Sequence, residues 1–400
     1  MSNDPALLVR ERITQLLDEV DVAEADMVEA RGRQYDLGLA WVHFPEGWGG
    51  LGLAPTHQKD IDAALRKAGA APADIRHFFG LTMAGPTVVT HGDDALKGRL
   101  LRRMFTGEDP WCQLFSEPGA GSDLAGLACK AVRDGDEWVV SGQKVWNTMA
   151  HIADRGMLVA RTDPDAPKHK GMTYFALDMN APGVEVRPLR QITGEAEFNE
   201  VYLTDVRVPD SDRIGDVGEG WRVAMTTLSN ERTTIGGGGG TPVRGSGAIA
   251  EAVRIWTDEP NVAHGAAARD RLVELWIRAE ALRLTNMRAA QNRKVGNPGP
   301  EGSIAKLMFA EINKDIYEFC VDLLGPAGQV GAVYDMIRPE HLGLIGAPGS
   351  SRKMFLRARA NSIEGGTSEI QRNIIGERVL GLPGEPRNDK SVPWKDVPRS

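Results

Sequence analysis

The sequence has little cysteine and no long apolar run. Its three cysteines among 400 residues, Cys112, Cys129 and Cys320, lie far apart. This spacing suits neither a disulfide framework nor a zinc site, so we expect reduced, buried thiols. No apolar run approaches the ~20 residues that a membrane-spanning helix needs. The eight histidines include no His-x-x-x-His pair. Neither membrane insertion nor a bound metal is therefore expected.

Clusters of basic residues are also missing. The net charge is −8, and no basic block accompanies it. This balance argues against nucleic acid or an anionic membrane surface as the main partner. Residues Met1–Pro5 are polar and lead into an amphipathic stretch without a signal-peptide core or an Arg/Ser-rich transit pattern. We therefore expect a cytoplasmic protein.

Several cofactor signatures are absent. No Gly-x-Gly-x-x-Gly stands between a strand and a helix, which leaves a Rossmann nucleotide site unsupported. The five glycines at 236–240 follow no strand and precede no Lys-Ser/Thr pair, so they are not a phosphate loop. The nucleophile elbow Gly-x-Ser-x-Gly does not occur either.

Hydrophobic periodicity divides the chain into helical, β and helical parts. Chain length predicts two or three domains, and an apolar content of 42% is typical of a globular protein. Asp134-Gly135 between two short apolar runs predicts a hairpin in the middle part. We therefore predict an α+β multidomain fold in four parts: an N-terminal helical domain (1–112), a β-barrel-like middle domain (113–212), a C-terminal four-helix-bundle domain (213–382) and a poorly ordered, Pro-rich tail (383–400).

The stretch from Phe115 to Thr148 is the most informative. It contains Ser116-Glu-Pro-Gly-Ala-Gly-Ser-Asp123 and, after the hairpin, Gly142-Gln-Lys-Val-Trp-Asn-Thr148. A Pro/Gly turn presents backbone N–H groups and hydroxyls, and Trp146 adds a flat aromatic surface. Together these suit a planar ligand with polar edges, such as an isoalloxazine. The structural alternative is an ordinary turn followed by a core tryptophan.

Two further segments are candidates. In Asn361–Asn373, two glycines allow close approach to a ligand, and Thr367 caps a helix whose N-terminus suits a diphosphate. In Leu228-Ser-Asn-Glu-Arg232, Glu231 is a candidate base. Each has a plain alternative, a capped final helix for the first and a solvated charge pair for the second.

Taken together, these segments resemble the acyl-CoA dehydrogenase family over residues 6–382. The landmarks occur in one order: Phe44–Gly52, Ser116–Asp123, Gly142–Thr148, Asp205–Pro209, Gly218–Trp221 and Gly366–Arg372. The resemblance implies FAD as the cofactor, an acyl-CoA substrate and α,β-dehydrogenation. It also implies electron transfer to an electron-transfer flavoprotein or a similar acceptor.

The resemblance also assigns site residues. Those expected at the isoalloxazine are Phe115, Ser116, Trp146 and Thr148. Those expected at the pantetheine or nucleotide of CoA are Ser122, Ser229 and Arg232, with Ser122 also counted among the cofactor-binding positions. Those expected near the remainder of FAD are Gly325, Thr367 and Glu369.

The catalytic base is expected on one of two segments. Many family members carry a Glu directly before Gly-Thr in the C-terminal motif, but this chain has Gly365 there, and Glu364 is one residue too early. Other branches place the base in Leu-x-x-Glu-Arg, where this chain has Glu231. We therefore expect Glu231 as the base, Glu364 as the runner-up, and the Gly365 N–H as a donor to the thioester oxygen.

Two departures from the family pattern concern assembly. The usual Arg-x-x-Phe-Gly is absent between Arg254 and Ala268, and Asp322 stands where a Gln is usual. Either other residues hold FAD in a homo-oligomer, or a related subunit completes the site in a hetero-oligomer, as in family members acting on steroid side chains. The glycines at 236–240 are expected to loosen the pocket for a large substrate. Two other functions stay open: an oxygen-reactive oxidase or monooxygenase, and a catalytically silent partner subunit.

Overall fold

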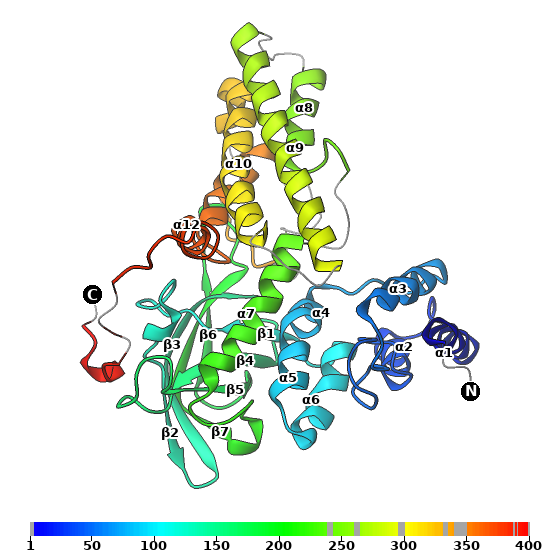
Figure 1. Cartoon of the computed structure of the whole chain (residues 1–400), viewed down its shortest axis with the longest axis vertical. Helices are drawn as coiled ribbons and strands as arrows, with labels where there is room; N and C mark the ends of the chain where they lie inside the picture. The colour runs from blue at the N-terminus through cyan, green and yellow to red at the C-terminus, as the bar shows by residue number, and fades with distance from the viewer. Residues whose placement is uncertain are drawn as a thin grey trace. The chain divides into compact units, whose positions relative to one another are not determined.

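The structure, a computed structural model, describes residues 4–237, 243–259, 265–294, 301–330, 335–339, 350–386, 389 and 391–398. The chain forms two compact units (Figure 1). The first unit comprises Met1–Leu189, Glu197–Asn230 and Asn388–Ser400. The second comprises Arg190–Ala196 and Glu231–Arg387. Each unit has its own core, and each is described below by itself.

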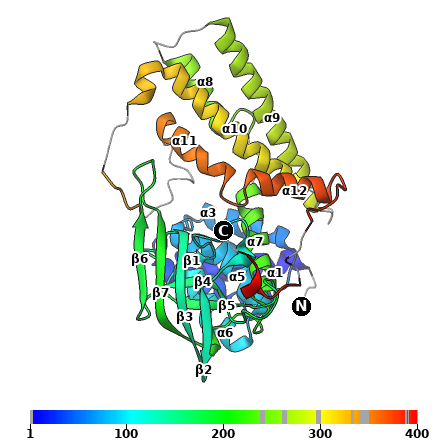
Figure 2. The same ribbon diagram turned by 90° about the vertical axis from the view of Figure 1, so that its left-hand side faces the viewer.

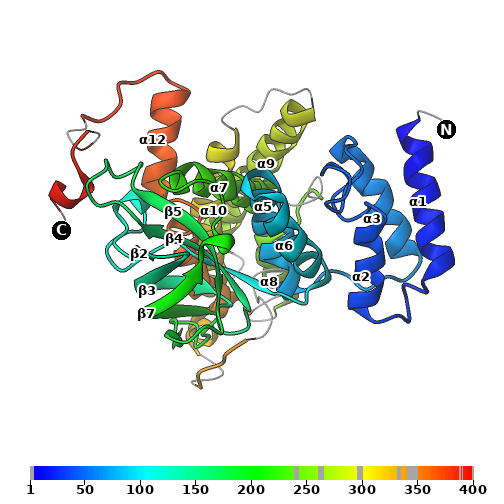
Figure 3. The same ribbon diagram turned by 90° about the horizontal axis from the view of Figure 1, so that it is seen from below.

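The first unit begins with helices, as predicted. They are α1 (Pro5–Glu19), α2 (Met27–Asp36), α3 (Gln58–Lys67), α4 (Ile75–Phe79), α5 (Gly85–His91) and α6 (Asp94–Thr106), with a π-helical turn at Gly80–Ala84 between α4 and α5. Asp4 caps α1 by accepting from the Ala6 N–H at 3.0 Å, and Gly107 ends α6 in the left-handed conformation. Figure 3 shows α1, α2 and α3 grouped together. Apolar side chains of α1 and α3 share one core.

A sheet of seven strands follows (Figure 2). The strands are β1 (Trp111–Leu114), β2 (Lys130–Asp134), β3 (Glu137–Thr148), β4 (Arg155–Arg161), β5 (Met172–Asp178), β6 (Val184–Leu189) and β7 (Phe198–Pro209). Their order is β1-β4-β2-β3-β7-β6, with β5 on β4. The predicted hairpin is present, because Asp134 pairs with Glu137 around a two-residue turn in which Gly135 has φ 66°.

Helix α7 (Gly220–Gly237) returns to helical structure after the sheet. In the first unit its buried face carries Val223, Ala224 and Thr227. The Thr227 hydroxyl lies 2.8 Å from the Thr87 hydroxyl on α5 and 3.1 Å from the Tyr174 hydroxyl on β5. This buried polar cluster therefore joins α7 to both a helix and a strand.

The second unit is helical. It contains α8 (Ala248–Asp258), α9 (Ala266–Lys294), α10 (Glu301–Leu324), α11 (Ser351–Arg357) and α12 (Ser368–Arg378). The predicted amphipathic helices are present as α9 and α10, and α10 ends at Leu324, directly before Gly325, which has φ 55°. Buried side chains of α8, α9 and α10 form the core, among them Ile249, Ile255, Leu275, Ile312 and Phe319.

The prediction of a poorly ordered tail is wrong for residues 389 and 391–398. Trp394 begins a short 3₁₀ turn (Trp394–Asp396) and is 9% exposed. Its backbone N–H donates to the Ala166 carbonyl at 2.9 Å. Proline and charge discourage helices and strands, but they do not prevent an aromatic side chain from finding a buried place on a folded domain. The described part of the tail belongs to the first unit.

All three cysteines are free and buried. Burial raises the pKa of the Cys129 thiol to about 11 and that of Cys320 to about 12, and it also raises that of Cys112. These thiols are therefore poor nucleophiles near neutral pH. Among the helices that the structure describes, none is long and apolar enough to cross a bilayer.

Candidate active site

The two segments of the first candidate site lie side by side in the first unit. The chain after β1 runs along β3 and is tied to it by hydrogen bonds. The Ser116 carbonyl accepts from the Val145 N–H at 2.9 Å. The Gln113 carbonyl accepts from the Asn147 Nδ2 at 2.8 Å. Residues that are about thirty positions apart in the sequence therefore form one continuous edge beside Trp146.

A buried ion pair holds this edge together. The Lys144 ammonium is fully buried and lies 2.8 Å from the Glu117 carboxylate. It also donates to the Phe115 carbonyl at 3.1 Å. Glu117 in turn accepts from the backbone N–H groups of Ala128 at 2.6 Å and Cys129 at 2.9 Å. The carboxylate therefore fixes both ends of the loop between residues 117 and 128.

Trp146 is presented to the outside of the sheet. The pairing of β3 with β7 shifts register between Lys144 and Asn147, and Trp146 has φ 63° at this bulge. Its side chain is 57% exposed, and its ring meets Phe198 edge-on with centroids 5.9 Å apart. A non-glycine residue in the left-handed region is strained, and such strain is concentrated at functional sites. The alternative of a core tryptophan is therefore wrong.

Three hydroxyls near this edge are available to a ligand. Within the described residues, the hydroxyls of Ser116, Ser122 and Thr148 form no hydrogen bond; Ser122 is exposed, and the other two are half-buried. In the same part of the chain, the buried Oδ1 of Asn147 has no partner. An exposed indole with nearby unengaged polar groups fits an aromatic ligand with polar edges, as FAD requires.

The residues expected on α7 belong to different faces of that helix. Ser229 is exposed and Glu231 is half-buried. Because Glu231 follows Thr227 by four positions, it lies one turn further along the same face. Arg232 lies in α7, but its side chain is outside the described part. Gly236 and Gly237 are the last residues of α7, and residues 238–240 lie outside the part of the chain that the structure describes.

In the second unit, the runner-up base Glu364 is fully engaged. Buried Arg357 donates to both of its carboxylate oxygens, at 3.1 and 2.7 Å, and the Asn361 Nδ2 donates at 2.8 Å. A bidentate arginine on a carboxylate is among the strongest side-chain pairings. Proton abstraction by Glu364 would require this pairing to break and would cost the buried guanidinium two charge-assisted hydrogen bonds.

The glycine loop that follows has a fixed shape. Gly365 and Gly366 have φ 62° and 90°, and the Lys306 ammonium donates to the carbonyls of Asn361 at 2.8 Å and Gly366 at 2.5 Å. Burial lowers the pKa of Lys306, and the charge of Glu364 opposes that shift. Among the described residues, nothing accepts a hydrogen bond from the Gly365 N–H. This donor is therefore available to a ligand.

The remaining predicted positions lie in two places, at the start of α12 and directly after the end of α10. The Thr367 hydroxyl caps α12 by accepting from the Ile370 N–H at 3.2 Å. Glu369 is exposed and pairs with Arg372 at 3.3 Å. Gly325 has open space where a side chain would be. A capped helix N-terminus next to two glycines can receive an anionic group.

Comparison with known proteins decides the family. Residues 6–108 match the N-terminal domain of acyl-CoA dehydrogenase, residues 112–206 its middle domain and residues 218–380 its C-terminal domain. Acyl-CoA dehydrogenase IpdE1 of Mycobacterium tuberculosis is 37% identical over 87% of this chain and 86% of its own length. The chain belongs to the acyl-CoA dehydrogenase family. The predicted resemblance and three-part fold are thus confirmed.

Other relatives have the same architecture. Acyl-CoA dehydrogenase FadE34 of M. tuberculosis is 40% identical over 90% of this chain, which spans about half (48%) of that relative's length. A solved structure named "Tcur3481-Tcur3483 steroid ACAD" is 25% identical with a TM-score of 0.70, covering 96% of this chain and all of that one. The ChsE4-ChsE5 complex from M. tuberculosis is 27% identical with a TM-score of 0.68, at the same coverage. The predicted class, a flavin-dependent oxidoreductase, is confirmed by this membership.

Sequence reasoning missed two residues that hold this acyl-CoA dehydrogenase site in shape. Lys144 and Glu117 lie inside the motifs that predicted the site, yet their role depends on a contact across 27 positions. The local sequence contains no signal for the pair, because Glu117 follows Ser116 and Lys144 follows Gln143, both polar. Lys306 was missed for the same reason, although it stands on the otherwise apolar face of α10 between Ile304 and Leu307.

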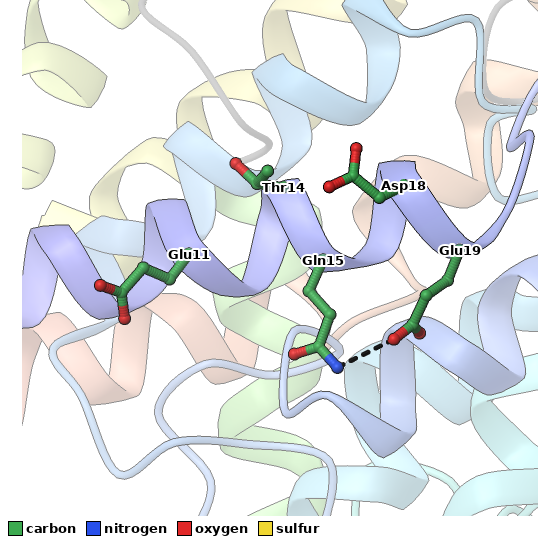
Figure 4. Close-up of a pocket in the computed structure, with 5 residues that line it drawn as sticks. All are labelled: Glu11, Thr14, Gln15, Asp18 and Glu19. Atoms are coloured by element: carbon green, nitrogen blue, oxygen red, sulfur yellow. Dashed lines mark hydrogen bonds between the residues drawn. The ribbon is translucent and has the colours of Figure 1, made fainter.

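A separate hollow on α1 is not part of this site (Figure 4). All of its lining residues come from this one helix: Glu11, Thr14, Gln15, Asp18 and Glu19. Gln15 donates to Glu19 at 2.9 Å, as Figure 4 shows. A shallow acidic surface on a single helix brings no groups together from different elements, and we assign it no function.

We predict that Lys144→Met destabilises the protein by about 3–5 kcal/mol, because it leaves the buried Glu117 carboxylate without its cation. The matched control is Arg207→Ala, which removes an exposed partner of Glu137 on the same sheet and should cost less than about 1 kcal/mol. Denaturant unfolding monitored by circular dichroism measures both. Equal losses in the two variants would contradict the structural role of the buried pair.

Proposed function

We propose that this chain is an FAD-dependent acyl-CoA dehydrogenase that converts an acyl-CoA thioester to the trans-2-enoyl-CoA. The observation that carries the proposal is the exposed Trp146 indole on a strained bulge, next to the Ser116 loop. These residues lie within the segment that matches the middle domain of the family. An oxygen-reactive oxidase gains no comparable support from any residue described.

Two sets of residues would contact FAD. Trp146 would cover one face of the isoalloxazine, and Phe115, Ser116 and Thr148 would line its edge. Thr367 and Glu369, at the N-terminus of α12, and Gly325, after the end of α10, would serve the remainder of FAD. When bound, FAD supplies the acceptor for the hydride that leaves Cβ of the substrate.

Glu231 is the proposed base that removes the Cα proton. Two observations support it over Glu364. Glu364 is held by Arg357 and Asn361, and Glu231 stands in the Leu-x-x-Glu-Arg setting on α7. Loss of the Cα proton moves negative charge to the thioester oxygen, where the Gly365 N–H would donate a hydrogen bond. Ser122, Ser229 and Arg232 would contact the CoA part of the substrate.

Replacement of Glu231 by Gln should slow reduction of the bound flavin by acyl-CoA at least about 100-fold, within the range for loss of a general base. The matched variant Glu364→Gln should retain most of the reduction rate and lose thermal stability, because Arg357 loses a charged partner. Anaerobic stopped-flow absorbance measures the rates, and FAD content verifies that both variants bind the cofactor. Fast reduction in Glu231→Gln together with loss in Glu364→Gln would reverse the assignment.

Trp146→Ala should weaken FAD binding by about tenfold, since loss of an aromatic packing surface costs about 1.5 kcal/mol. Trp146→Phe should recover part of that loss. Val132→Ala is the matched control, because Val132 is equally exposed (57%) on β2 of the same sheet. Flavin fluorescence after dilution measures dissociation. An unchanged FAD affinity in Trp146→Ala would remove the indole from the proposed site.

The substrate and assembly are inferred from relatives. Solved structures named as a steroid acyl-CoA dehydrogenase and as a ChsE4-ChsE5 complex support a bulky, ring-bearing acyl-CoA and a hetero-oligomer with a related subunit. The missing Arg-x-x-Phe-Gly also supports this assembly. In the structure Arg254 is instead paired with Glu251 at 2.8 and 2.9 Å. A homo-oligomer is the alternative. An electron-transfer flavoprotein or similar acceptor in the cytoplasm would receive the electrons.

If this assembly is correct, the purified complex should contain fewer FAD molecules than acyl-CoA dehydrogenase chains. Native mass spectrometry and flavin absorbance of the chain, expressed alone and with a related subunit, give the ratio. One FAD per chain in a homo-oligomer would contradict the hetero-oligomer. Efficient turnover of a linear long-chain acyl-CoA would contradict the bulky substrate independently.

A further inference from the structure

The C-terminal tail beyond the family fold docks against the loop that carries Ser122. The match to the acyl-CoA dehydrogenase C-terminal domain ends at residue 380, but Asp389 and residues 391–398 pack on the middle domain in the first unit. We propose that these residues act as a strap that positions the Ser122 loop (residues 121–126) for ligand binding. The ligand named here, the CoA moiety, rests on the proposed function.

The first attachment is Trp394. Its indole Nε1 donates to the carbonyl of Gly126, at the end of the Ser122 loop, at 3.3 Å. On the other side, the backbone N–H of Trp394 donates to Ala166, and that of Lys395 donates to Pro164 at 3.0 Å. The strap is therefore held to the segment between β4 and β5 while its aromatic ring reaches the Ser122 loop.

Arg161 contacts the Trp394 ring, the Ser122 loop and the segment between β4 and β5. Its guanidinium carbon lies 4.7 Å from the centre of the Trp394 ring, within the range of a cation–π contact. The same buried side chain donates to the Ala125 carbonyl at 2.7 Å and to the Lys168 carbonyl at 2.8 Å. Removal of the Trp394 ring would uncover a charged group that itself holds the Ser122 loop.

The second attachment is Lys168. Its ammonium lies 3.0 and 3.1 Å from the two carboxylate oxygens of Asp123, the residue after Ser122. It also lies 2.5 Å from the carboxylate of Asp389 in the strap. The Lys168 side chain is buried although Asp123 is largely exposed. One cation thus joins the strap to Asp123, directly after Ser122, and Trp394 joins the strap to Gly126 at the end of the loop.

The arrangement explains how an exposed, glycine-rich loop keeps one shape. Gly119 and Gly121 have open space around them, so packing of their own does not restrain the backbone. The Glu117 carboxylate fixes the outer ends of the 117–128 loop, and Lys168 at Asp123 and Trp394 at Gly126 add restraint within it. A loop that is ordered before the ligand arrives loses less entropy on binding, so affinity at Ser122 should depend on the strap.

The experiment compares Trp394→Ala and Lys168→Met in the full chain loaded with FAD. Hydrogen exchange of the amides at 119–127 measures loop order, and calorimetry with coenzyme A itself measures affinity. Both variants should accelerate exchange in this segment and weaken coenzyme A binding about five- to tenfold, as expected for the loss of about one hydrogen bond's worth of affinity. With an acyl-CoA substrate, KM should rise while kcat changes little.

Two controls separate positioning from general instability. Lys395→Ala removes an exposed ion pair with Asp165 and should leave exchange and affinity unchanged. Lys168→Arg keeps the charge that bridges Asp123 and Asp389 and should restore coenzyme A affinity. Exchange and affinity equal to those of Lys395→Ala would overturn the strap, as would faster exchange with unchanged affinity. If the unaltered protein binds no coenzyme A, the proposed function is overturned. The proposed role of the strap in CoA binding is then overturned with it, whatever the exchange rates are.

Discussion

The site depends first on one buried ion pair. Lys144 and Glu117 lie at the centre of the edge where the chain after β1 meets β3, and they fix Phe115, Ser116 and the 117–128 loop in one arrangement. Burying such a charge pair costs desolvation free energy. Here two backbone N–H groups that donate to Glu117, and the Phe115 carbonyl that accepts from Lys144, offset that cost. We infer that its value is specificity, because Lys144 holds Phe115 and Glu117 at one position beside β3.

Much of this fold could be predicted from the sequence because its signals are local. Hairpin residues Asp134-Gly135, the amphipathic faces of α9 and α10, and the motif between Phe115 and Thr148 each contain their information within a short stretch. Trp146 illustrates the limit. Its identity predicted an aromatic surface, but its exposure follows from a register shift against β7 that no single strand specifies.

The features that sequence reasoning missed are all long-range. Composition alone predicted disorder for the tail, but burial of Trp394 depends on Gly126 and Arg161, which lie more than 200 residues away. The positioning roles of Lys144 and Lys306 likewise exist only once their backbone partners are assembled. The position of Glu364 in the sequence made it the runner-up to Glu231 as base, and the pairing of both its oxygens with Arg357 supports that order.

The central claim is that this chain, through the flavin edge around Trp146, oxidises an acyl-CoA thioester. It is tested most directly by anaerobic titration of the FAD-loaded protein, in its native assembly, with a series of acyl-CoAs that includes ring-bearing side chains. We predict loss of the flavin absorbance near the visible maximum together with formation of the enoyl-CoA. An oxidised flavin that keeps its spectrum with every acyl-CoA, while bound to a correctly assembled protein, would contradict it.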